Sequence, residues 1–598
     1  MSRIKIGVID TFINLNHDCF NVKQNNNTIK IIETEKAINN QTVGHGTAVT
    51  SIIYNNTINC DITVFPIFNS FNDQVELERL INLLESINLE YDFDIINLSN
   101  GIVLEENNYE LESICKKITQ KGTIIVSAYD NSGLMTYPAS YESVVGVDVS
   151  DKFYNIKQYE FIEGSRINIV GTNFPIRVPW ENNSYILLSG TSFVTAYITA
   201  IISNALFESE NVYDYLRKKA SKVTECKKMM YPEIPFEIKK AVIFPFNKEM
   251  HALIKFQEVL SFNIVGYFDL KYSPNIGKKV SEIVYNVNNN NAKIKSINLI
   301  DWYNDFDTII IGHLDKVMQI LNDECINGII DNCIKYNKRI YCYDKLIYNK
   351  ICNYTNDFSN INVFFPKVGI ENVPSLNNKK LWAISTPIIC IMGTSSNQGK
   401  YTLLLTIRKY FEERGYNTGM VSTEPNGWLL NADAVFPYGY LNSIDVKEIE
   451  TIQYINEMLH IIEKKNVDII MSSSQSGTIP YNNLIYNNIS IEQLSFLYAF
   501  NPDCVILCVS PHDDIEYIKR TVCFIEAAAT TKVISIAVYP IVQQEFCGGI
   551  YKGINLANTD KIINFISELK RSLDIDIVVE NNLDGASKIT ESIIEYLS

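Results

Sequence analysis

The sequence lacks three features that would each assign it to a well-defined class. Its 13 cysteines include no pair spaced as Cys-x-x-Cys, which excludes a zinc ribbon and a dithiol redox site. Basic residues are outnumbered, 52 Lys and Arg against 68 Asp and Glu, whereas a general nucleic-acid binder carries a positive surface. No apolar run is long enough to span a bilayer, and residues 1–10 lack the apolar core of a signal peptide. We therefore expect a cytoplasmic protein with reduced cysteines and with neither a nucleic acid nor a membrane as partner.

The length and the pattern of apolar segments predict several α/β domains. A chain of 598 residues corresponds to three or four domains of about 100–200 residues each. Short apolar runs of strand length alternate with helical stretches, which indicates parallel sheets covered on both faces. Residues 223–238 carry two prolines and a charge cluster, and we interpret them as a linker. The predicted domains are residues 1–222, 239–385 and 386–598.

Three short motifs supply an acid, a base and a nucleophile in the order Asp, His, Ser. They are Ile6-Gly-Val-Ile-Asp10, Gly44-His45-Gly46-Thr47 and Ser189-Gly190-Thr191-Ser192. A serine hydroxyl is a weak nucleophile near neutral pH, so an adjacent imidazole must take its proton. His45 would be that base, and Asp10 would hold its tautomer and stabilise the imidazolium. Each motif alone is common, but together and in this order they predict a serine peptidase with the triad Asp10, His45 and Ser192.

These motifs resemble those of the subtilase family, the S8 serine peptidases, over residues 1–222. The resemblance extends to Val126–Gly133, where Asn131 corresponds to the side chain that donates to the oxyanion, and to the segment Ser99, Asn100 and Gly101. It implies a subtilisin-like three-layer domain with a parallel sheet and a serine endopeptidase that needs no cofactor. It also implies that residues 99–101 form the edge that pairs with an extended peptide substrate. Asp130 stands where the family has a glycine, and we expect it to shift the backbone beside Asn131.

A second motif predicts a site for a phosphate group. Pro387-Ile-Ile-Cys-Ile-Met-Gly393-Thr-Ser-Ser-Asn-Gln-Gly399-Lys400-Tyr-Thr402 reads as a strand, a glycine-rich loop and a helix start. Backbone N–H groups at such a helix start bind anions, and a lysine neutralises the outer phosphates. Five residues separate the glycines where the usual loop has four, and Tyr401 stands where a magnesium-binding hydroxyl is usual. A glycine-rich turn with a structural lysine is the alternative interpretation.

The loop resembles that of the dethiobiotin synthetase and cobyric acid synthase group, and more closely that of the DUF1611 family. The latter resemblance implies a Rossmann-like α/β domain at 239–385, a P-loop NTPase-like α/β domain at 386–598, and ATP or another nucleotide as ligand. The nucleotide-binding residues would be Gly393, Thr394, Gly399, Lys400 and Thr402. Ser473 replaces an acid of the family, so no metal ligand is assigned and magnesium stays open.

Together these features predict an intracellular subtilisin-like endopeptidase that performs limited proteolysis of a peptide or precursor protein. Over its whole length the chain also resembles a clostridial peptide-maturation family found with small ribosomal peptide precursors, which implies leader removal and other maturation enzymes as partners. The absence of a signal or propeptide before Asp10 favours this over digestion of nutrients. Two alternatives stay open: a nucleotide-dependent ligase or kinase acting on the peptide, and a non-catalytic scaffold in a maturation complex.

Overall fold

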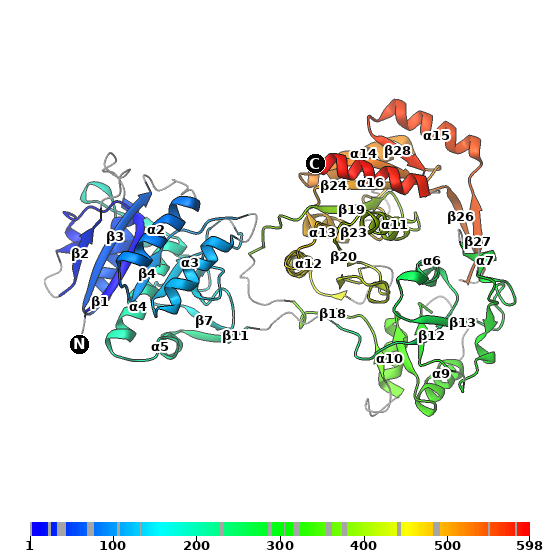
Figure 1. Cartoon of the computed structure of the whole chain (residues 1–598), viewed down its shortest axis with the longest axis horizontal. Helices are drawn as coiled ribbons and strands as arrows, with labels where there is room; N and C mark the ends of the chain where they lie inside the picture. The colour runs from blue at the N-terminus through cyan, green and yellow to red at the C-terminus, as the bar shows by residue number, and fades with distance from the viewer. Residues whose placement is uncertain are drawn as a thin grey trace. The chain divides into compact units, whose positions relative to one another are not determined.

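The computed structural model divides the chain into two compact units. The first consists of Met1–Met229 with Pro374–Ser385, and the second of Met230–Val373 with Thr386–Ser598. Figure 1 shows the elements of each unit in chain order. The structure describes residues 3–21, 26–32, 44–68, 77–104, 108–131, 133–226, 232–284, 287, 290–303, 305–314, 323–354, 362–373, 380–438, 444–481, 491–547, 550–579 and 583–598.

A nine-stranded sheet in the order β11-β7-β8-β6-β5-β4-β1-β3-β2 forms the centre of the first unit. All neighbouring pairs are parallel except β7 with β8. Its strands are β1 (Ile4–Thr11), β2 (Thr28–Ile31), β3 (Cys60–Phe68), β4 (Ile95–Leu98), β5 (Ile124–Ala128), β6 (Val144–Ser150), β7 (Glu160–Glu163), β8 (Ile169–Thr172) and β11 (Lys222–Glu225). A separate antiparallel pair is formed by β9 (Ile176–Pro179) and β10 (Tyr185–Leu188).

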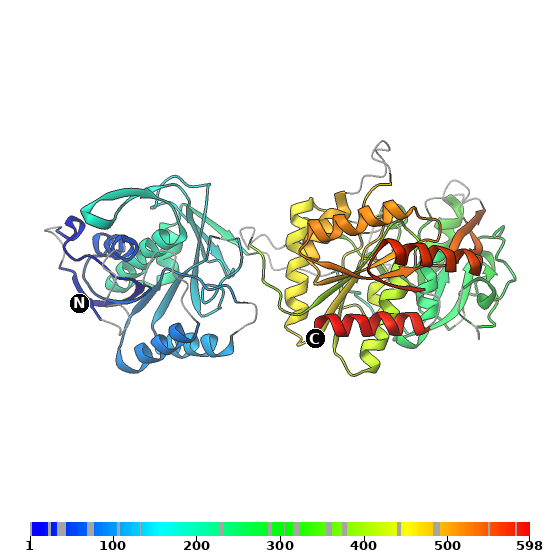
Figure 2. The same ribbon diagram turned by 90° about the horizontal axis from the view of Figure 1, so that it is seen from above.

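Helices cover both faces of this sheet, so that the unit has three layers (Figure 2). The helices are α1 (Gly44–Asn56), α2 (Leu77–Glu90), α3 (Tyr109–Gln120), α4 (Thr191–Phe207) and α5 (Val212–Lys219). One core contains side chains of α1, α4 and α5, and the other contains side chains of α2 and α3. The expected three-layer parallel-sheet architecture is therefore present, and the apolar run at Thr191–Phe207 is a helix buried nearly all round.

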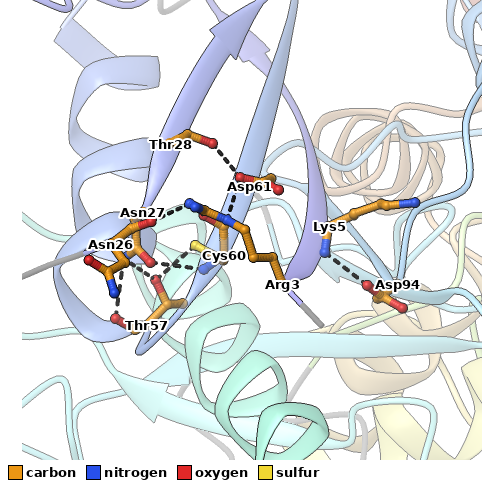
Figure 3. Close-up of polar contacts among 9 residues, drawn as sticks. All are labelled: Arg3, Lys5, Asn26, Asn27, Thr28, Thr57, Cys60, Asp61 and Asp94. Atoms are coloured by element: carbon orange, nitrogen blue, oxygen red, sulfur yellow. Dashed lines mark hydrogen bonds and ion pairs between the residues drawn. The ribbon is translucent and has the colours of Figure 1, made fainter. Parts of the chain in front are cut away.

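Strand β1 is anchored at its beginning by charged side chains of neighbouring segments (Figure 3). The Arg3 guanidinium lies 2.7 Å from the Asp61 carboxylate and donates to the carbonyl of Cys60 at 3.1 Å. The backbone N–H of Lys5 donates to Asp94 at 2.8 Å. β1 lies between β3 and β4 in the interior of the sheet and pairs with β3 along its whole length. This pairing fixes the position of its other end, where Asp10 lies.

The structure assigns to the first unit two segments that the sequence pattern places outside residues 1–222. Lys222–Glu225 pairs with β7 as strand β11, so the predicted linker 223–238 begins inside a strand. Residues 380–385, predicted to close the domain 239–385, pack on the first unit instead. Leu381 forms a parallel bridge with Leu134, and Trp382 lies in the same core as α2 and α3. Residues 227–231 of the predicted linker lie outside the described residues.

The first sheet of the second unit has the order β14-β13-β12-β15-β16-β17, and all its described pairs are parallel. Its strands are β12 (Lys240–Phe244), β13 (Asn263–Asp269), β14 (Lys295–Ser296), β15 (Thr308–Ile311), β16 (Arg339–Cys342) and β17 (Val363–Phe364). The helices that accompany it are α6 (His251–Lys255), α7 (Val280–Ile283), α9 (Asp323–Lys335) and α10 (Lys345–Tyr354). This parallel α/β arrangement agrees with the predicted fold class, while the Rossmann-like assignment itself stays a prediction.

The second sheet has the order β21-β20-β23-β19-β24-β25-β28 and is parallel throughout. Helices lie on both of its sides (Figure 2). Its strands are β19 (Ile388–Gly393), β20 (Thr418–Ser422), β21 (Ala434–Val435), β23 (Ile469–Ser473), β24 (Cys504–Val509), β25 (Lys532–Val538) and β28 (Asp576–Val579). The helices are α11 (Lys400–Glu413), α12 (Glu448–Glu463), α13 (Ile491–Phe500), α14 (Ile515–Ala528), α15 (Thr559–Ser572) and α16 (Leu583–Leu597).

Two short ribbons complete the second unit, β18 (Val368–Gly369) with β22 (Ile444–Asp445) and β26 (Ile541–Cys547) with β27 (Ile550–Leu556). One apolar core joins side chains from both sheets, including Ile243 and Tyr341 of the first and Ile391 of the second. The hydroxyl of Tyr341 also donates to the carbonyl of Pro425 at 2.7 Å. The two sheets therefore share their packing.

We predict that Lys222→Met destabilises the first unit in a pH-dependent way. Burial alone would raise the pKa of Glu160, but hydrogen bonds from Lys222 and Thr224 outweigh it, and the pKa is lowered. This ion pair therefore stabilises the fold above the unfolded pKa of Glu, about 4.3, and its contribution is lost as the pH falls through the folded pKa. Because Lys222 is half-exposed, we expect a loss of about 1 kcal/mol at neutral pH.

Thermal unfolding of wild type and variant at neutral pH and at about pH 3, well below that unfolded pKa, checks this expectation. The difference in melting temperature should shrink as the pH falls, because protonation of Glu160 removes the charge that Lys222 pairs with. A difference that stays constant with pH would show that Lys222 acts through its packing and not through its charge.

Candidate functional site

The side chains of Asp10 and His45 are joined by a short hydrogen bond. Asp10 is the penultimate residue of β1 and His45 the second residue of α1. His45 Nδ1 lies 2.7 Å from Asp10 Oδ1, and both side chains are buried. The same carboxylate oxygen accepts the backbone N–H of Thr11 at 2.7 Å. With Nδ1–H donating to the carboxylate, Nε2 of His45 is the ring nitrogen that can accept a proton.

Thr11 and Gly46 fix the contact between β1 and α1. The backbone N–H of Gly46 donates to Thr11 Oγ1 at 2.8 Å, and that hydroxyl also lies 3.2 Å from Asp10 Oδ1. A Cβ on residue 46 would lie 2.4 Å from the carbonyl oxygen of Thr11, closer than non-bonded atoms approach. Only glycine therefore allows α1 to start so close to β1, and this approach places His45 against Asp10.

Ser192 is the second residue of α4, a helix whose other residues are mostly buried. The residue before the helix, Gly190, has φ of 154°, a conformation that favours glycine. Ser192 Oγ donates to the carbonyl of Ser99 at 2.8 Å. The rings of His45 and Phe193 have centroids 5.7 Å apart, so the imidazole lies beside the first turn of α4. The hydroxyl at this helix start experiences the positive end of the helix dipole.

The other residues predicted for the peptidase lie at the same edge of the sheet. Asn131 is exposed and follows β5. A Cβ built on Gly190 would lie 4.0 Å from its Nδ2, which places the amide beside the turn before Ser192. Ser99, Asn100 and Gly101 follow β4; Ser99 is buried, and the other two are half-buried. The structure thus gathers the ends of β1, β4 and β5 and the start of α4 around Ser192.

The glycine-rich loop of the second unit connects β19 to α11 as the sequence predicts. Gly399, immediately before the helix, has φ of 74°, in the left-handed region. Lys400 is buried, and its Nζ donates to the carbonyl of Ser395 at 2.7 Å. A Cβ on Gly393 would lie 2.7 Å from Gln398 Oε1 and 3.1 Å from Lys400 Nζ. The loop therefore wraps closely around the lysine, as an anion cradle requires.

Two of the loop residues are already engaged within the protein. The N–H of Thr394 donates to the Cys508 carbonyl at 3.1 Å, and its hydroxyl donates to Asp513. The N–H of Ser395 donates to Gln398 Oε1 at 2.9 Å. Thr394 thus supports the loop wall, and the N–H groups after Ser395, at the start of α11, are those placed to face an anion.

The metal side of this site is weaker than the anion side. The hydroxyl of Tyr401 accepts a hydrogen bond from Ser422 Oγ at 3.3 Å. Ser473 Oγ is buried and has no hydrogen-bond partner among the described residues. Burial raises the pKa of Glu424, opposed by a hydrogen bond from Gln475 and by the charges of Lys248 and Lys400. The residues present therefore fit a phosphate group, and for magnesium they offer Glu424 and, one residue further along α11, Thr402.

Two protein families match separate parts of the chain. The subtilase family matches residues 2–222. A P-loop domain of unknown function, DUF1611, matches residues 377–541. The chain joins a subtilase to a DUF1611 P-loop domain. None of the curated proteins matches it. The resemblances to the subtilase and DUF1611 families are thereby confirmed, and the first unit is a serine peptidase of the subtilase type.

Several solved structures are similar to parts of the chain. The prenylagaramide maturation protease PagA is 21% identical, with a TM-score of 0.28 and coverage of 35% of this chain and 78% of its own. A cold-adapted subtilisin-like serine proteinase is 20% identical, with a TM-score of 0.30 and coverage of 37% and 86%. A DUF1611 protein from Anabaena variabilis is 14% identical, with a TM-score of 0.42 and coverage of 60% and 100%. These similarities assign the chain neither a substrate nor a ligand.

Two residues that support the sites through contacts with distant parts of the chain were not predicted from the sequence, Thr11 in the subtilase unit and Lys248 at the P-loop. Thr11 follows Asp10 directly, and the spacing of the motifs gives no sign that it binds Gly46. Lys248, from the segment after β12, donates to Asn397 Oδ1 of the P-loop at 2.8 Å and adds a second cation there. No local pattern marks either contact, because each joins residues far apart in the chain.

We predict that Gly46→Ala lowers both stability and peptidase activity. The new methyl group meets the backbone of Thr11, which cannot move without displacing Asp10, and overpacking of this kind costs about 1–3 kcal/mol. Thermal unfolding and hydrolysis of a peptide substrate measure the two effects. Gly328→Ala in α9 is the matched control, because a Cβ there meets nothing within 4 Å. Wild-type activity and stability in Gly46→Ala would contradict the close approach.

Proposed function

We propose that the subtilase unit is an endopeptidase that cuts a peptide or precursor protein at a limited number of bonds. The observation that carries this proposal is the 2.7 Å contact between Asp10 and His45 beside the helix start that bears Ser192. An acid, a base and a nucleophile in this relation are what acyl transfer from a peptide requires. The peptidase reaction itself calls for no cofactor.

Each triad residue has a distinct chemical task in this proposal. The Ser192 side chain turns from the Ser99 carbonyl toward His45, and such contacts commonly tighten only when substrate binds. Ser192 Oγ then attacks the scissile carbonyl carbon while its proton passes to His45 Nε2, and Asp10 stabilises the imidazolium. His45 gives the proton to the leaving amine, which leaves an ester on Ser192. Water hydrolyses that ester by the same route.

Asn131 and the segment after β4 bind the substrate around the reacting bond. The Asn131 amide lies beside the turn before Ser192 and can donate to the oxyanion of the tetrahedral intermediate. Loss of such a donor costs about 10²–10³ in turnover. Residues 99–101 offer main-chain groups to an extended peptide, a common mode of peptide binding at a sheet edge.

A precursor substrate is supported by the covalent joining of the peptidase to a second α/β unit. Two sites on one chain reach effective concentrations of about 1 mM for each other's bound ligand when the linker is short. A substrate held or modified by one unit is thereby presented to the other, which suits maturation of one peptide better than general digestion. Removal of a leader from a ribosomally made peptide, with other maturation enzymes as partners, is the form of this function that we propose.

We propose that the protein acts in the cytoplasm. Outside residues 541–556, the structure shows no disulfide among the described cysteines, and most of them are buried. Cysteines without disulfides are usual in reducing compartments. None of the helices that the structure describes combines the length and the apolar character needed to cross a membrane.

We further propose that the P-loop binds ATP or another nucleotide and hydrolyses it slowly. Gly393, Gly399, Lys400 and the start of α11 supply an anion site. Phosphoryl transfer also needs metal neutralisation of the developing charge, and here Tyr401 and Ser473 stand where stronger metal ligands are usual. The weaker metal ligands should therefore reduce the rate of nucleotide hydrolysis much more than the affinity for the nucleotide.

A nucleotide-dependent ligase or kinase acting on the peptide is the second candidate function. The observation in its favour is Glu424, a half-buried carboxylate close enough to Lys400 and Lys248 for their charges to oppose the rise of its pKa. Its carboxylate could hold a metal at the loop. Nucleotide consumption that depends on the peptide substrate would favour this candidate over a site that only binds.

We predict that Ser192→Ala abolishes peptide cleavage and leaves the fold intact. The change removes only one oxygen near the surface, whereas loss of the nucleophile costs on the order of 10⁶ in turnover. Cleavage of a peptide substrate, with circular dichroism as the test of folding, measures the result. Ser189→Ala, at an exposed position three residues earlier, is the control and should cleave normally. Cleavage by Ser192→Ala near the wild-type rate would contradict the triad.

We predict that wild type binds ATP in calorimetric titration and that Lys400→Ala does not. Lys400 is the buried ammonium inside the loop, and its loss removes the charge that neutralises the phosphates. Lys409→Ala is the control, because Lys409 lies on the exposed face of the same helix and pairs with Glu258. Failure of the wild type to bind any nucleotide would show that the loop is structural. Phosphate release at about 1–100 s⁻¹, as kinases achieve, would contradict the proposed weakness of the metal site.

A further inference from the structure

The loop that carries Asn131 is held by a segment that lies outside the subtilase match. We define the oxyanion loop as residues 129–135, of which Ser132 lies outside the described residues. Asn131 itself is exposed, so its position depends on the residues on either side. Residues 380–382 contact the loop both before and after Asn131, although they follow it by about 250 residues.

Lys380 binds the loop immediately before Asn131. Its Nζ donates to the carbonyl of Asp130 at 2.6 Å and lies 3.4 Å from the carboxylate of Asp148 on β6. It also lies 5.8 Å from the centre of the Tyr129 ring. Lys380 is only 6% exposed and Asp148 3%. A lysine is rarely buried to this extent unless it is paired, so the ammonium is held specifically between the oxyanion loop and β6.

The main chain of Leu381 binds the loop immediately after Asn131. Its N–H donates to the carbonyl of Gly133 at 3.0 Å, and its carbonyl accepts the N–H of Met135 at 2.8 Å. Trp382 then enters the core that contains Tyr129 and Met135. The segment thus pairs with the loop through a single parallel bridge, is anchored by one buried aromatic side chain, and reaches Asp130 through Lys380.

Asp130, the residue before Asn131, is held on both sides of its backbone. Its N–H donates to Thr136 Oγ1 at 3.1 Å, and its carbonyl accepts a hydrogen bond from Lys380. Both main-chain groups of the residue before Asn131 are therefore fixed. An oxyanion donor acts only when it is placed in advance, and a displacement of about 1 Å can cost about 10² in rate.

We propose that Lys380 is a positioning residue of the peptidase, which acts by holding the carbonyl of Asp130 so that Asn131 faces the oxyanion. The active peptidase therefore includes residues 380–382, beyond the 2–222 of its family match and inside the 377–541 of the DUF1611 match. This inference rests on the proposed peptidase function. Residues 2–222 alone consequently lack a segment that, in the first unit, holds the loop of Asn131.

The test compares full-length wild type with Lys380→Met and Lys380→Arg. Two rates are measured: hydrolysis of a chromogenic peptide, separated into kcat and KM, and labelling by a fluorophosphonate probe. Lys380→Met should lower kcat and the labelling rate by about 10–100-fold with KM little changed, because only transition-state stabilisation is lost. Lys380→Arg keeps the charge and donors and should restore most of the rate. Lys222→Met, which removes another lysine from a buried carboxylate in the same unit, should leave both rates unchanged.

A second pair of variants separates positioning from stability. If Lys380→Met does not fold, because the buried Asp148 carboxylate has lost a cationic partner, the double variant Lys380→Met/Asp148→Asn removes both charges and should still show the loss of kcat. In the Asn131→Ala background, Lys380→Met should cause little further loss, since both changes remove the same donor. If Lys380→Met lowers kcat by the same factor in the Asn131→Ala background as in wild type, the proposal is wrong.

The outcomes distinguish this inference from the proposed function. Labelling of the folded Lys380→Met variant, or of the double variant, at the wild-type rate would overturn the positioning assignment alone and leave the peptidase intact. Absence of labelling in the wild type would contradict the peptidase itself and the positioning assignment with it.

Discussion

The chemistry of the first unit depends on one contact, the 2.7 Å hydrogen bond between Asp10 and His45. The bond needs β1 and α1 to approach so closely that residue 46 has no room for a side chain. It also needs β1 to be fixed inside the sheet, where it pairs with β3 and β4 and is anchored at its start by Arg3, Asp61 and Asp94. The rest of the unit then brings Ser192 and Asn131 to the same edge, on elements that pack against this frame.

The triad could be predicted from the sequence because each of its residues lies at a junction with a local signature. Asp10 follows an apolar run of strand length, and the motifs around His45 and Ser192 each open a helix. The same holds for the P-loop, where glycines and a lysine connect a buried strand to a helix. At such junctions the required backbone conformation limits the choice of residue. The residues needed for the fold and those needed for the chemistry therefore occur together in one short motif, which can be recognised in the sequence.

The limits of the first unit could not be predicted in this way. β11 is mostly exposed and lacks the apolar alternation of a half-buried strand, so its last three residues, 223–225, were predicted to begin a linker. Residues 380–385 were expected at the end of the domain 239–385, because the next α/β pattern begins near Pro387. Their contacts with Asp130 and Leu134 join residues far apart in the chain, and no propensity or spacing reports such a pairing. The departure at Asp130 was visible in the sequence, but its partner Lys380 was not.

The proposed peptidase function requires Ser192 to be the nucleophile of a working triad. The most direct measurement is to label the full-length protein with a fluorophosphonate probe and to locate the adduct by mass spectrometry of its peptides. The account predicts a single phosphonylated residue, Ser192, and no adduct when the protein is unfolded beforehand, because an unassisted serine hydroxyl is a weak nucleophile. Absence of an adduct on the folded protein, or an adduct at another residue, would contradict it.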